Sequence, residues 1–332
     1  MWLQIWSIIS AMKTLTTTDY ALVFPGQGSQ YVGMGLEIFK EFISAEKIYE
    51  IAEGVSNLDI RNLCFFGDEE NLMETSITQP CLLATNIALY TVFQEHFSKK
   101  PKFICGHSAG EYSALVAAGV LSFTDAMNLL QVRGALMSKT KEGGMVAFKG
   151  VTLEEVEKIC KQNVQPGGVL VPANLNSPEQ IVISGDTDSI ESALIFAFDN
   201  NLKAIPLSVS GAFHSPLMHE AAQEFANIIA NSQFHDADIP VISNVTAKPV
   251  ISGYNWSQLL EQQIYSAVRW EASIRYIHEK GIDVFIEVGP GKVLSKLIKK
   301  ILPSAITLNV ENIQSLQQTL VKLQEVFDLQ LV

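Results

Sequence analysis

A serine between two glycines constrains this chain more than any other feature. Ser108 lies in the stretch Gly106-His107-Ser108-Ala109-Gly110, after the apolar run 103–105 and before a helix-forming segment, 111–118. This order predicts a strand, a sharp turn and a helix, because glycine on either side of the serine lets the backbone turn tightly. Free N–H groups at the helix start would face negative charge that develops beside the hydroxyl. We therefore predict that Ser108 is a nucleophile in an α/β fold.

A serine nucleophile needs a base, because its hydroxyl is barely ionised near neutral pH. Of the six histidines, only His214 follows a predicted strand and a turn of small residues and precedes a predicted helix. Active sites collect at such junctions in α/β sheets. His107 adjoins Ser108, but neighbours at a tight turn point in different directions. His214 is therefore the candidate base, and a purely structural histidine is the alternative.

Arg133 is expected in the middle of an apolar helix face. The neighbours that share this face are Ala126, Leu129, Leu130, Leu136 and Met137. Residues three, four and seven positions apart lie on one side of a helix, so the arginine would be surrounded by apolar side chains. An uncompensated buried charge is strongly destabilising, so Arg133 needs an anion. That anion is either an internal Asp or Glu or a substrate carboxylate held by two hydrogen bonds.

The composition excludes several classes of protein. The chain has 332 residues, of which 48% are hydrophobic and 17% charged, so it can bury a core and is not disordered. A formal net charge of −12 argues against a nucleic-acid partner. Four scattered cysteines predict buried thiols in the cytoplasm, not disulfides or a zinc site. The apolar start belongs to an expected extension, 1–15, and is too short to span a membrane.

Residues 141–207 read as a unit of their own. Their expected order is strand, helix, strand, strand, helix, strand, which is the order of a ferredoxin-like unit. We therefore predict a small subdomain at 141–207, inserted into a large α/β subdomain that residues 16–140 and 208–325 form. Asn174 is expected with Asn176 in the central turn of the insert, where both would line a cleft or be solvated.

A glycine-rich loop follows the first predicted strand, 20–24. The stretch Pro25-Gly26-Gln27-Gly28 continues without the third glycine of a dinucleotide site or the Gly-Lys pair of a phosphate loop. We therefore expect Gln27 and its backbone N–H to approach a bound group other than a nucleotide. Helical spacing further predicts helices at 36–53 and 80–97, the second with Pro80 in its first turn.

Taken in order, these motifs resemble those of the malonyl-CoA:acyl-carrier-protein transacylases, including the free-standing acyltransferases that serve polyketide synthases. The resemblance runs from about residue 22 to residue 320 and rests on seven stretches: Phe24–Gln30, Thr78–Pro80, Gly106–Tyr112, Gln131–Gly134, Asn174–Pro178, Gly211–Ser215 and Glu287–Gly291. It implies an α/β-hydrolase-like large subdomain with an inserted ferredoxin-like small subdomain. The active site of the family lies in the cleft between the two.

The resemblance also implies a role for each matching residue. Ser108 would be the nucleophile and His214 its base, oriented by a backbone carbonyl instead of an acid. The backbone N–H groups of Gln27 and Ala109 would form the oxyanion hole, and Arg133 would hold the malonyl carboxylate. Four further residues would line the substrate site: His107, Asn176, Phe213 and Gln263.

The implied reaction is a transfer in two steps. A malonyl group passes from malonyl-CoA to Ser108 and then to the phosphopantetheine thiol of an acyl carrier protein, for fatty-acid or polyketide synthesis. The expected partners are a coenzyme A thioester and a carrier protein, with no metal or redox cofactor, and the protein is expected to be a monomer.

The alternative function is a hydrolase that removes acyl groups from carrier proteins with the same serine and histidine. Arg133 argues against it, because a pocket for neutral acyl chains has no use for a buried cation.

Two residues bear on which acyl group is chosen. Ala109, where relatives commonly carry a larger aliphatic residue, is expected to widen the pocket. Phe213, beside the base, is expected to favour malonyl over methylmalonyl.

Overall fold

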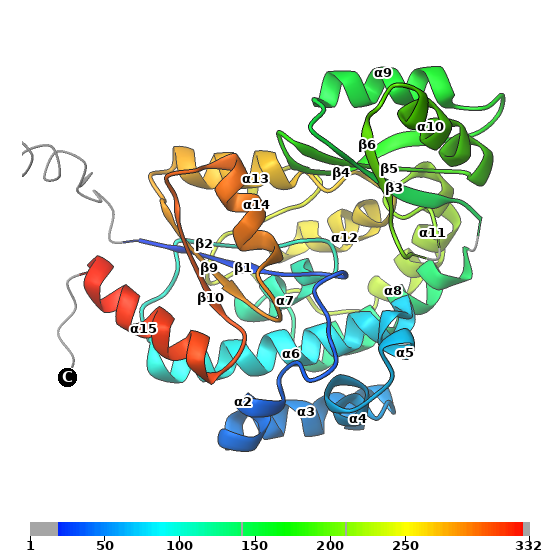
Figure 1. Ribbon diagram of the computed structural model, residues 1–332. Coiled ribbons are helices and arrows are strands. Elements are labelled where there is room, and N and C mark those ends of the chain that lie inside the picture. The colour runs from blue at the N-terminus through cyan, green and yellow to red at the C-terminus, as the bar shows by residue number, and fades with distance from the viewer. Residues whose placement is uncertain (1–18, 141, 210, 328–332) are drawn as a thin grey trace, which may run out of the picture.

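The computed structural model describes residues 19–140, 142–209 and 211–327, so the expected extension 1–15 lies outside the described residues. Two sheets organise this part of the chain (Figure 1). The larger sheet has the strand order β10-β9-β1-β2-β7-β8, and all its pairings are parallel except that of β7 with β8. Its strands are β1 (Ala21–Phe24), β2 (Phe103–Gly106), β7 (Val241–Ile242), β8 (Pro249–Val250), β9 (Val284–Val288) and β10 (Ile306–Val310).

The larger sheet is buried on both faces, as a parallel sheet covered by helices must be. In β1, Leu22 and Phe24 face one apolar core, whereas Ala21 and Val23 face another, because successive side chains of a strand point to opposite sides. The longer helices of the first core are α3 (Ile43–Ser56), α6 (Thr75–His96), α7 (Gly110–Ala117), α8 (Phe123–Lys139), α11 (His219–Ile229), α12 (Trp256–Tyr265) and α15 (Ile313–Phe327). Those of the second are α13 (Trp270–Glu279) and α14 (Val293–Ile301).

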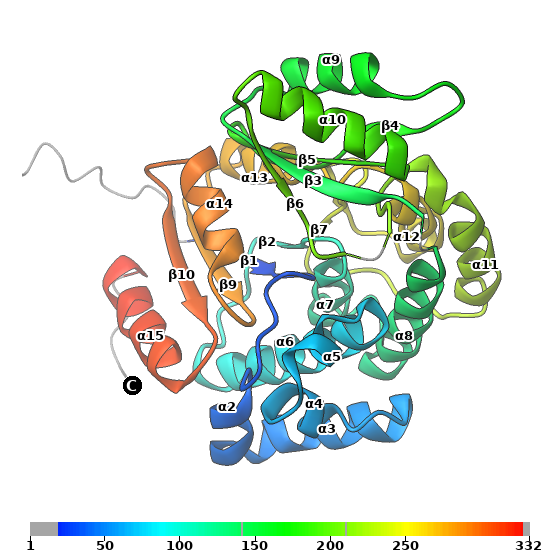
Figure 2. The ribbon, with the colours of Figure 1, turned by 45° about the vertical axis from the view of Figure 1, so that its right-hand side comes forward.

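A second, antiparallel sheet lies within residues 144–206 and has the strand order β4-β5-β3-β6. The chain builds it in the predicted order of strand, helix, strand, strand, helix, strand. The elements are β3 (Gly144–Lys149), α9 (Leu153–Asn163), β4 (Leu170–Ser177), β5 (Gln180–Gly185), α10 (Thr187–Asp199) and β6 (Lys203–Pro206). Both helices cover the outer face of this sheet, and its other face is turned toward the larger sheet (Figure 2). The predicted fold class is confirmed.

Strand β4 bonds to the segment that connects α12 to α13. The backbone N–H of Leu175 donates to the carbonyl oxygen of Val268 at 2.9 Å, and the N–H of Val268 donates to that of Ala173 at 2.8 Å. These bonds hold the antiparallel sheet, called the inner sheet from here on, against the segment before α13. As a result, the edge where β1 and β2 end lies opposite the inner sheet, and the two strands end together because Phe24 pairs with Gly106.

Two sequence predictions about helices were wrong. The helix predicted at 36–53 is broken at Phe42, which is extended, into α2 (Leu36–Glu41) and α3. The helix α6 begins at Thr75, so Pro80 lies in its interior and not in its first turn. Tertiary contacts hold the added turn: the Thr78 hydroxyl donates to Leu72 O at 2.6 Å, and Gln79 Oε1 accepts a hydrogen bond from α8. Short helices also occur at Ile60–Phe65 (α4) and Glu69–Met73 (α5).

None of the helices in the described residues is both long and apolar enough to cross a bilayer.

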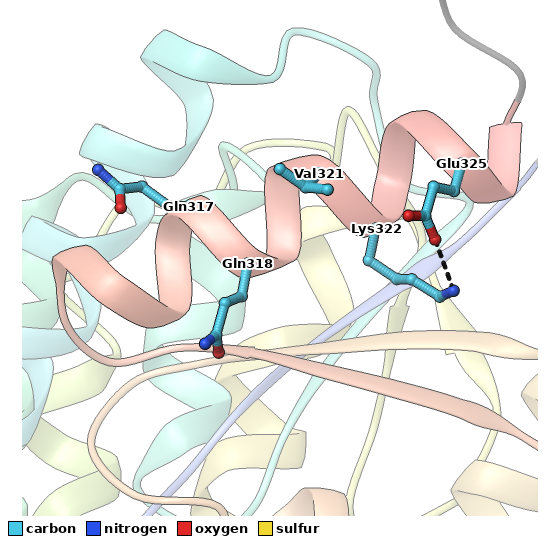
Figure 3. A pocket seen from close by; sticks show the side chains of 5 residues that line it. All are labelled: Gln317, Gln318, Val321, Lys322 and Glu325. Atoms are coloured by element: carbon cyan, nitrogen blue, oxygen red, sulfur yellow. Dashed lines mark hydrogen bonds and ion pairs between the residues drawn. The ribbon is translucent and has the colours of Figure 1, made fainter.

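A hollow of about 310 Å³ lies on α15, where Val321 and four polar side chains line it (Figure 3). Two of these, Lys322 and Glu325, pair with each other at 2.7 Å. All the lining residues come from one helix, so no groups converge on the hollow from different elements as they do in a binding site.

Candidate active site

The turn after β2 has the geometry of a nucleophile elbow. Ser108 lies between β2 and α7 with φ +51°, in the left-handed region that residues other than glycine rarely adopt. A Cβ at Gly106 would collide with the backbone of Gly110, and a Cβ at Gly110 would collide with the carbonyl of Phe24. Both glycines are therefore required for β1, β2 and α7 to approach one another around the serine.

Asn244 fixes the elbow from a neighbouring strand end. Its side-chain Oδ1 accepts a hydrogen bond from the backbone N–H of Ser108 at 2.8 Å, and its Nδ2 donates to Gly106 O at 2.6 Å. The sequence analysis missed this residue. Its position just after β7 is the available signal, because polar groups at the carboxyl ends of adjacent parallel strands meet at one edge of the sheet.

Ser108 and His214 form a hydrogen-bonded pair. The Oγ of Ser108 lies 2.8 Å from Nε2 of His214, and Nδ1 of His214 lies 2.8 Å from the backbone oxygen of Gln263. A carbonyl oxygen only accepts, so Nδ1 carries the proton and Nε2 is free to accept that of the serine hydroxyl. The structure thus places a backbone carbonyl where many serine enzymes place an acid.

His214 is expected to act as a base even in mildly acidic solution. Burial, with the charge of Arg133 as the next cause, lowers the pKa of His214 to about 3, so the ring is protonated only as the pH falls toward that value. The single-turnover rate of Ser108 acylation, followed by mass spectrometry, should therefore stay level from about pH 7 down to about pH 5. Circular dichroism at each pH provides the control for folding. A loss of rate centred near the ordinary histidine pKa of 6.5 would contradict this assignment.

Arg133 is fully buried on α8 and points at the nucleophile. Its Nη2 donates to the Ser108 hydroxyl at 3.1 Å and to Oε1 of Gln263 at 2.9 Å, and its Nη1 donates to Oε1 of Gln79 at 2.8 Å. Its Nε is buried and has no hydrogen-bond partner within the described residues. In the same part of the chain no carboxylate forms an ion pair with it, so the direct internal partner that the sequence left open is not seen.

A buried acid, Glu111, lies one residue beyond Arg133 in the hydrogen-bond network. Its Oε2 accepts from Nε2 of Gln263 at 2.5 Å and its Oε1 accepts from the backbone N–H of Asn244 at 2.7 Å. Burial raises the pKa of Glu111 to about 8. The sequence analysis gave this residue no role, although it is the only charged residue in the apolar segment 111–118 and the argument applied to Arg133 applies equally to it.

The groups expected to form the oxyanion hole lie beside the serine. Within the described residues, the backbone N–H groups of Gln27 and Ala109 have no acceptor. Asn86 holds the loop that carries Gln27, because its Nδ2 donates at 3.1 Å both to Pro25 O and to the hydroxyl of Ser113 on α7. The loop and the elbow are therefore held in one arrangement, with two N–H groups left for a ligand.

A small cavity of about 80 Å³ opens in front of Ser108. Its apolar lining is Met137, Met145, Leu207, Val209 and Phe213, and its polar lining is Gln27, Gln79, His107, Ser108, Arg133, Asn174 and His214. Ala109 does not line this cavity, because its side chain packs into the first core, so the expected widening at Ala109 is not seen.

Two residues expected to line the substrate site act from behind it. Asn176 lies outside the cavity lining, and its Oδ1 lies 2.8 Å from Nε2 of His107, so it orients that ring. Gln263 contacts Arg133 and Glu111 but does not line the cavity either. Asn174 lines the cavity instead, and its buried Oδ1 has no partner within the described residues. Both asparagines belong to β4 and not to a turn.

His107 lies beside the cavity and is held as a neutral ring. It lines the cavity, and its ring centroid lies 5.5 Å from that of Trp270. Burial lowers the pKa of His107. Its neutral ring therefore contributes polarity without adding a second positive charge near Arg133. Elsewhere, the described residues contain no group of three or more His, Cys, Asp or Glu side chains arranged to hold a metal ion.

Comparison with known proteins places this geometry in a family. Residues 21–327 match the model of the acyl transferase domain. A malonyl CoA-acyl carrier protein transacylase of Bacillus subtilis is 41% identical over 309 residues, which cover 92% of this chain and 97% of that protein. The solved structure of such a transacylase from Coxiella burnetii has a TM-score of 0.89 at 36% identity, covering 92% of this chain and 98% of the other.

A second solved structure shows a related enzyme with its partner. It contains a malonyl-transacylase in complex with a type II polyketide synthase acyl-carrier protein and matches with a TM-score of 0.88 at 37% identity, covering 92% of this chain and 99% of that one. Sequence and fold agree with those of these relatives across nearly the whole length. The chain therefore belongs to the acyl transferase family, among the malonyl-CoA:acyl carrier protein transacylases.

Proposed function

We propose that this protein transfers a malonyl group from malonyl-CoA to the phosphopantetheine thiol of an acyl carrier protein, through an ester on Ser108. One observation carries the proposal: the buried guanidinium of Arg133 lies 3.1 Å from the nucleophilic hydroxyl, through Nη2. An acyl group attached to Ser108 that ends in a carboxylate would meet this cation, whereas an acetyl group would leave it unpaired.

In the first half-reaction, Nε2 of His214 accepts the proton of Ser108 as Oγ attacks the thioester carbonyl carbon. The carbonyl oxygen becomes an oxyanion and is stabilised by the free N–H groups of Gln27 and Ala109. Collapse of the tetrahedral intermediate breaks the carbon–sulfur bond, and the departing CoA thiolate takes the proton from His214. Arg133 holds the malonyl carboxylate throughout.

In the second half-reaction, the thiol of the carrier protein repeats these steps in reverse. His214 takes the proton of the thiol, the sulfur attacks the ester carbonyl, and Ser108 Oγ leaves and regains the proton. Bonds and electrons balance with no net oxidation, so we propose that neither a metal nor a redox cofactor takes part. The carrier as partner is supported by the related transacylase that was solved with an acyl-carrier protein.

Malonyl is the proposed acyl group in preference to methylmalonyl. Phe213 lines a cavity of about 80 Å³ beside His214, and Met137 and Met145 also border it. A methyl branch next to the ester carbonyl would press on this lining, and overfilling a packed site is costly.

The test is intact-protein mass spectrometry of a phosphopantetheinylated carrier protein incubated with the enzyme and malonyl-, methylmalonyl- or acetyl-CoA. A carrier that gains the mass of malonyl, faster than either other group, is the expected result. The reverse assay presents the enzyme with a carrier already loaded with an acyl group. Release of free acid there, without malonyl loading in the first assay, would overturn the proposal in favour of a hydrolase.

A further inference from the structure

The charge of Arg133 is compensated in an unusual way. Within the described residues, its three hydrogen bonds go to neutral oxygens, those of Ser108, Gln79 and Gln263, and its Nε has no partner. A buried cation needs a counter-charge nearby. The carboxylate of Glu111 lies across the side-chain amide of Gln263, which accepts from Nη2 of Arg133 at 2.9 Å and donates to Glu111 at 2.5 Å.

We propose that Glu111, in its ionised form, is the counter-charge of Arg133 and takes up a proton when a substrate carboxylate binds there. The inference rests on the proposed function, because it presumes that a carboxylate-bearing acyl group enters the site. Glu111 acts through Gln263 and does not touch the substrate. Its role is to position the guanidinium of Arg133, which clamps the substrate carboxylate, and to balance the charge of that group.

The position of Glu111 explains why it does not block the clamp. A direct ion pair would occupy the donors of the guanidinium that a substrate carboxylate needs. With the Gln263 amide in between, the negative charge acts on Arg133 while Nε has no protein acceptor within the described residues. Once a substrate carboxylate arrives, two negative charges share one cation, and the more deeply buried carboxylate is the one that becomes neutral.

The Gln263 amide fits both protonation states. With Glu111 ionised, the amide N–H group donates to the carboxylate and its oxygen faces Arg133, as in the structure. With Glu111 protonated, the acid becomes a donor, and the amide turns over so that its oxygen accepts from Glu111. The NH₂ group of Gln263 would then face the substrate carboxylate beside Arg133. The turn breaks the 3.1 Å hydrogen bond that Nε2 of Gln263 donates to the backbone oxygen of Ser108 and brings its NH₂ group beside Nη2 of Arg133. The turned amide therefore needs the substrate carboxylate as the acceptor for both donors.

The charged and titratable groups around Glu111 do not interfere near pH 8. On its own helix and on β2, burial raises the pKa values of Tyr112 and Cys105. Burial lowers those of His107 and His214, and Arg133 remains charged. Glu111, whose pKa burial raises to about 8, is therefore the group of this cluster that changes protonation near that pH.

The proposal predicts how the KM for malonyl-CoA changes with pH. As the pH rises through about 8, Glu111 loses its proton and competes with the substrate for Arg133. The KM for malonyl-CoA should therefore rise, by roughly fivefold to tenfold between about pH 7 and about pH 9, since a fully linked proton changes affinity up to tenfold per pH unit. The KM for acetyl-CoA should show no such rise, because acetyl brings no carboxylate.

The experiment compares both KM profiles in the wild type, Glu111→Gln and Glu287→Gln. Glu287 is the matched control: it is also fully buried, but it accepts from the backbone N–H groups of Leu294 at 3.0 Å and Ser295 at 2.7 Å, at the start of α14. The malonyl-specific rise should vanish in Glu111→Gln and persist in Glu287→Gln. A rise that persists in Glu111→Gln, or that is absent from the wild type, overturns the proposal.

A second measurement does not depend on the folding of Glu111→Gln. Calorimetric binding of malonyl-CoA to Ser108→Ala at about pH 8, in buffers of different ionisation enthalpy, should show net proton uptake, and acetyl-CoA should show none. Equal proton exchange for the two ligands overturns the proposal. Failure of the proposed function gives a different result, because wild-type enzyme would then leave the carrier protein without malonyl at any pH.

Discussion

Replacing Ser108 by alanine is expected to abolish the malonyl-enzyme and to lower malonyl transfer by at least about 10⁴-fold, because the oxygen that forms the ester is removed. The neighbouring groups cannot substitute for it: His214 is held by Gln263 O at 2.8 Å, and Arg133 is a cation. Mass spectrometry of the enzyme after incubation with malonyl-CoA should show the added malonyl mass in the wild type and none in Ser108→Ala.

Ser138→Ala is the matched control for this experiment. Ser138 is on α8, the helix that carries Arg133, and its hydroxyl bonds only to the helix carbonyls of Gly134 and Ala135, so its loss should leave both acylation and transfer unchanged. The nucleophile assignment would fail if Ser108→Ala still acquired the malonyl mass.

Replacing Arg133 by alanine is expected to change which acyl group is transferred. Loss of a buried, charge-assisted pair with the substrate carboxylate should lower kcat/KM for malonyl-CoA by about 10²–10³-fold. The same variant should gain activity on acetyl-CoA and longer neutral acyl groups, because no unpaired cation remains beside the ester. Steady-state kinetics with both thioesters gives the ratio that tests this expectation.

Arg275→Ala controls for the loss of an arginine as such. Arg275 is half exposed and pairs with Glu271 one turn away, at 2.7 Å, on α13. Its removal should leave the malonyl-to-acetyl ratio as it is in the wild type. Thermal unfolding of Arg133→Ala shows whether the loss is one of folding. Full malonyl activity in a folded Arg133→Ala would rule out the carboxylate clamp.

The sequence was informative where the chemistry is local. The elbow around Ser108 needs only the glycines at 106 and 110, and the burial of Arg133 followed from the spacing of apolar residues along one helix. Partners far along the chain were beyond such patterns. Asn244 lies 136 residues from Ser108 and Gln263 lies 152 residues from Glu111, so their contacts exist only once β2, β7, α7 and α12 have packed together.

The asparagines of β4 show a second limit. Residues two apart on a regular strand share a face, so Asn174 and Asn176 would be expected to act alike. The pairing of β4 with β5 shifts register between Pro172 and Asn174 and again between Leu175 and Ser177. Such irregularities re-aim side chains, which accounts for Asn174 lining the cavity while Asn176 bonds to His107. Simple alternation of apolar and polar residues does not reveal a bulge.

Gln263 has a consequence for any attempt to re-engineer this protein. Its main-chain oxygen holds His214, and its side chain holds Arg133 and Glu111. The end of α12 thus positions both Arg133, which selects the acyl group, and His214, which acts as the base in its transfer. Since a displacement of about 1 Å at a reacting centre is enough to cost 10²-fold in rate, moving α12 to admit a new acyl chain would also detune the base. Acyl selectivity and turnover in this protein therefore depend on the same helix. Substitutions meant to change the selectivity alone must be made on α8 or in the inner sheet.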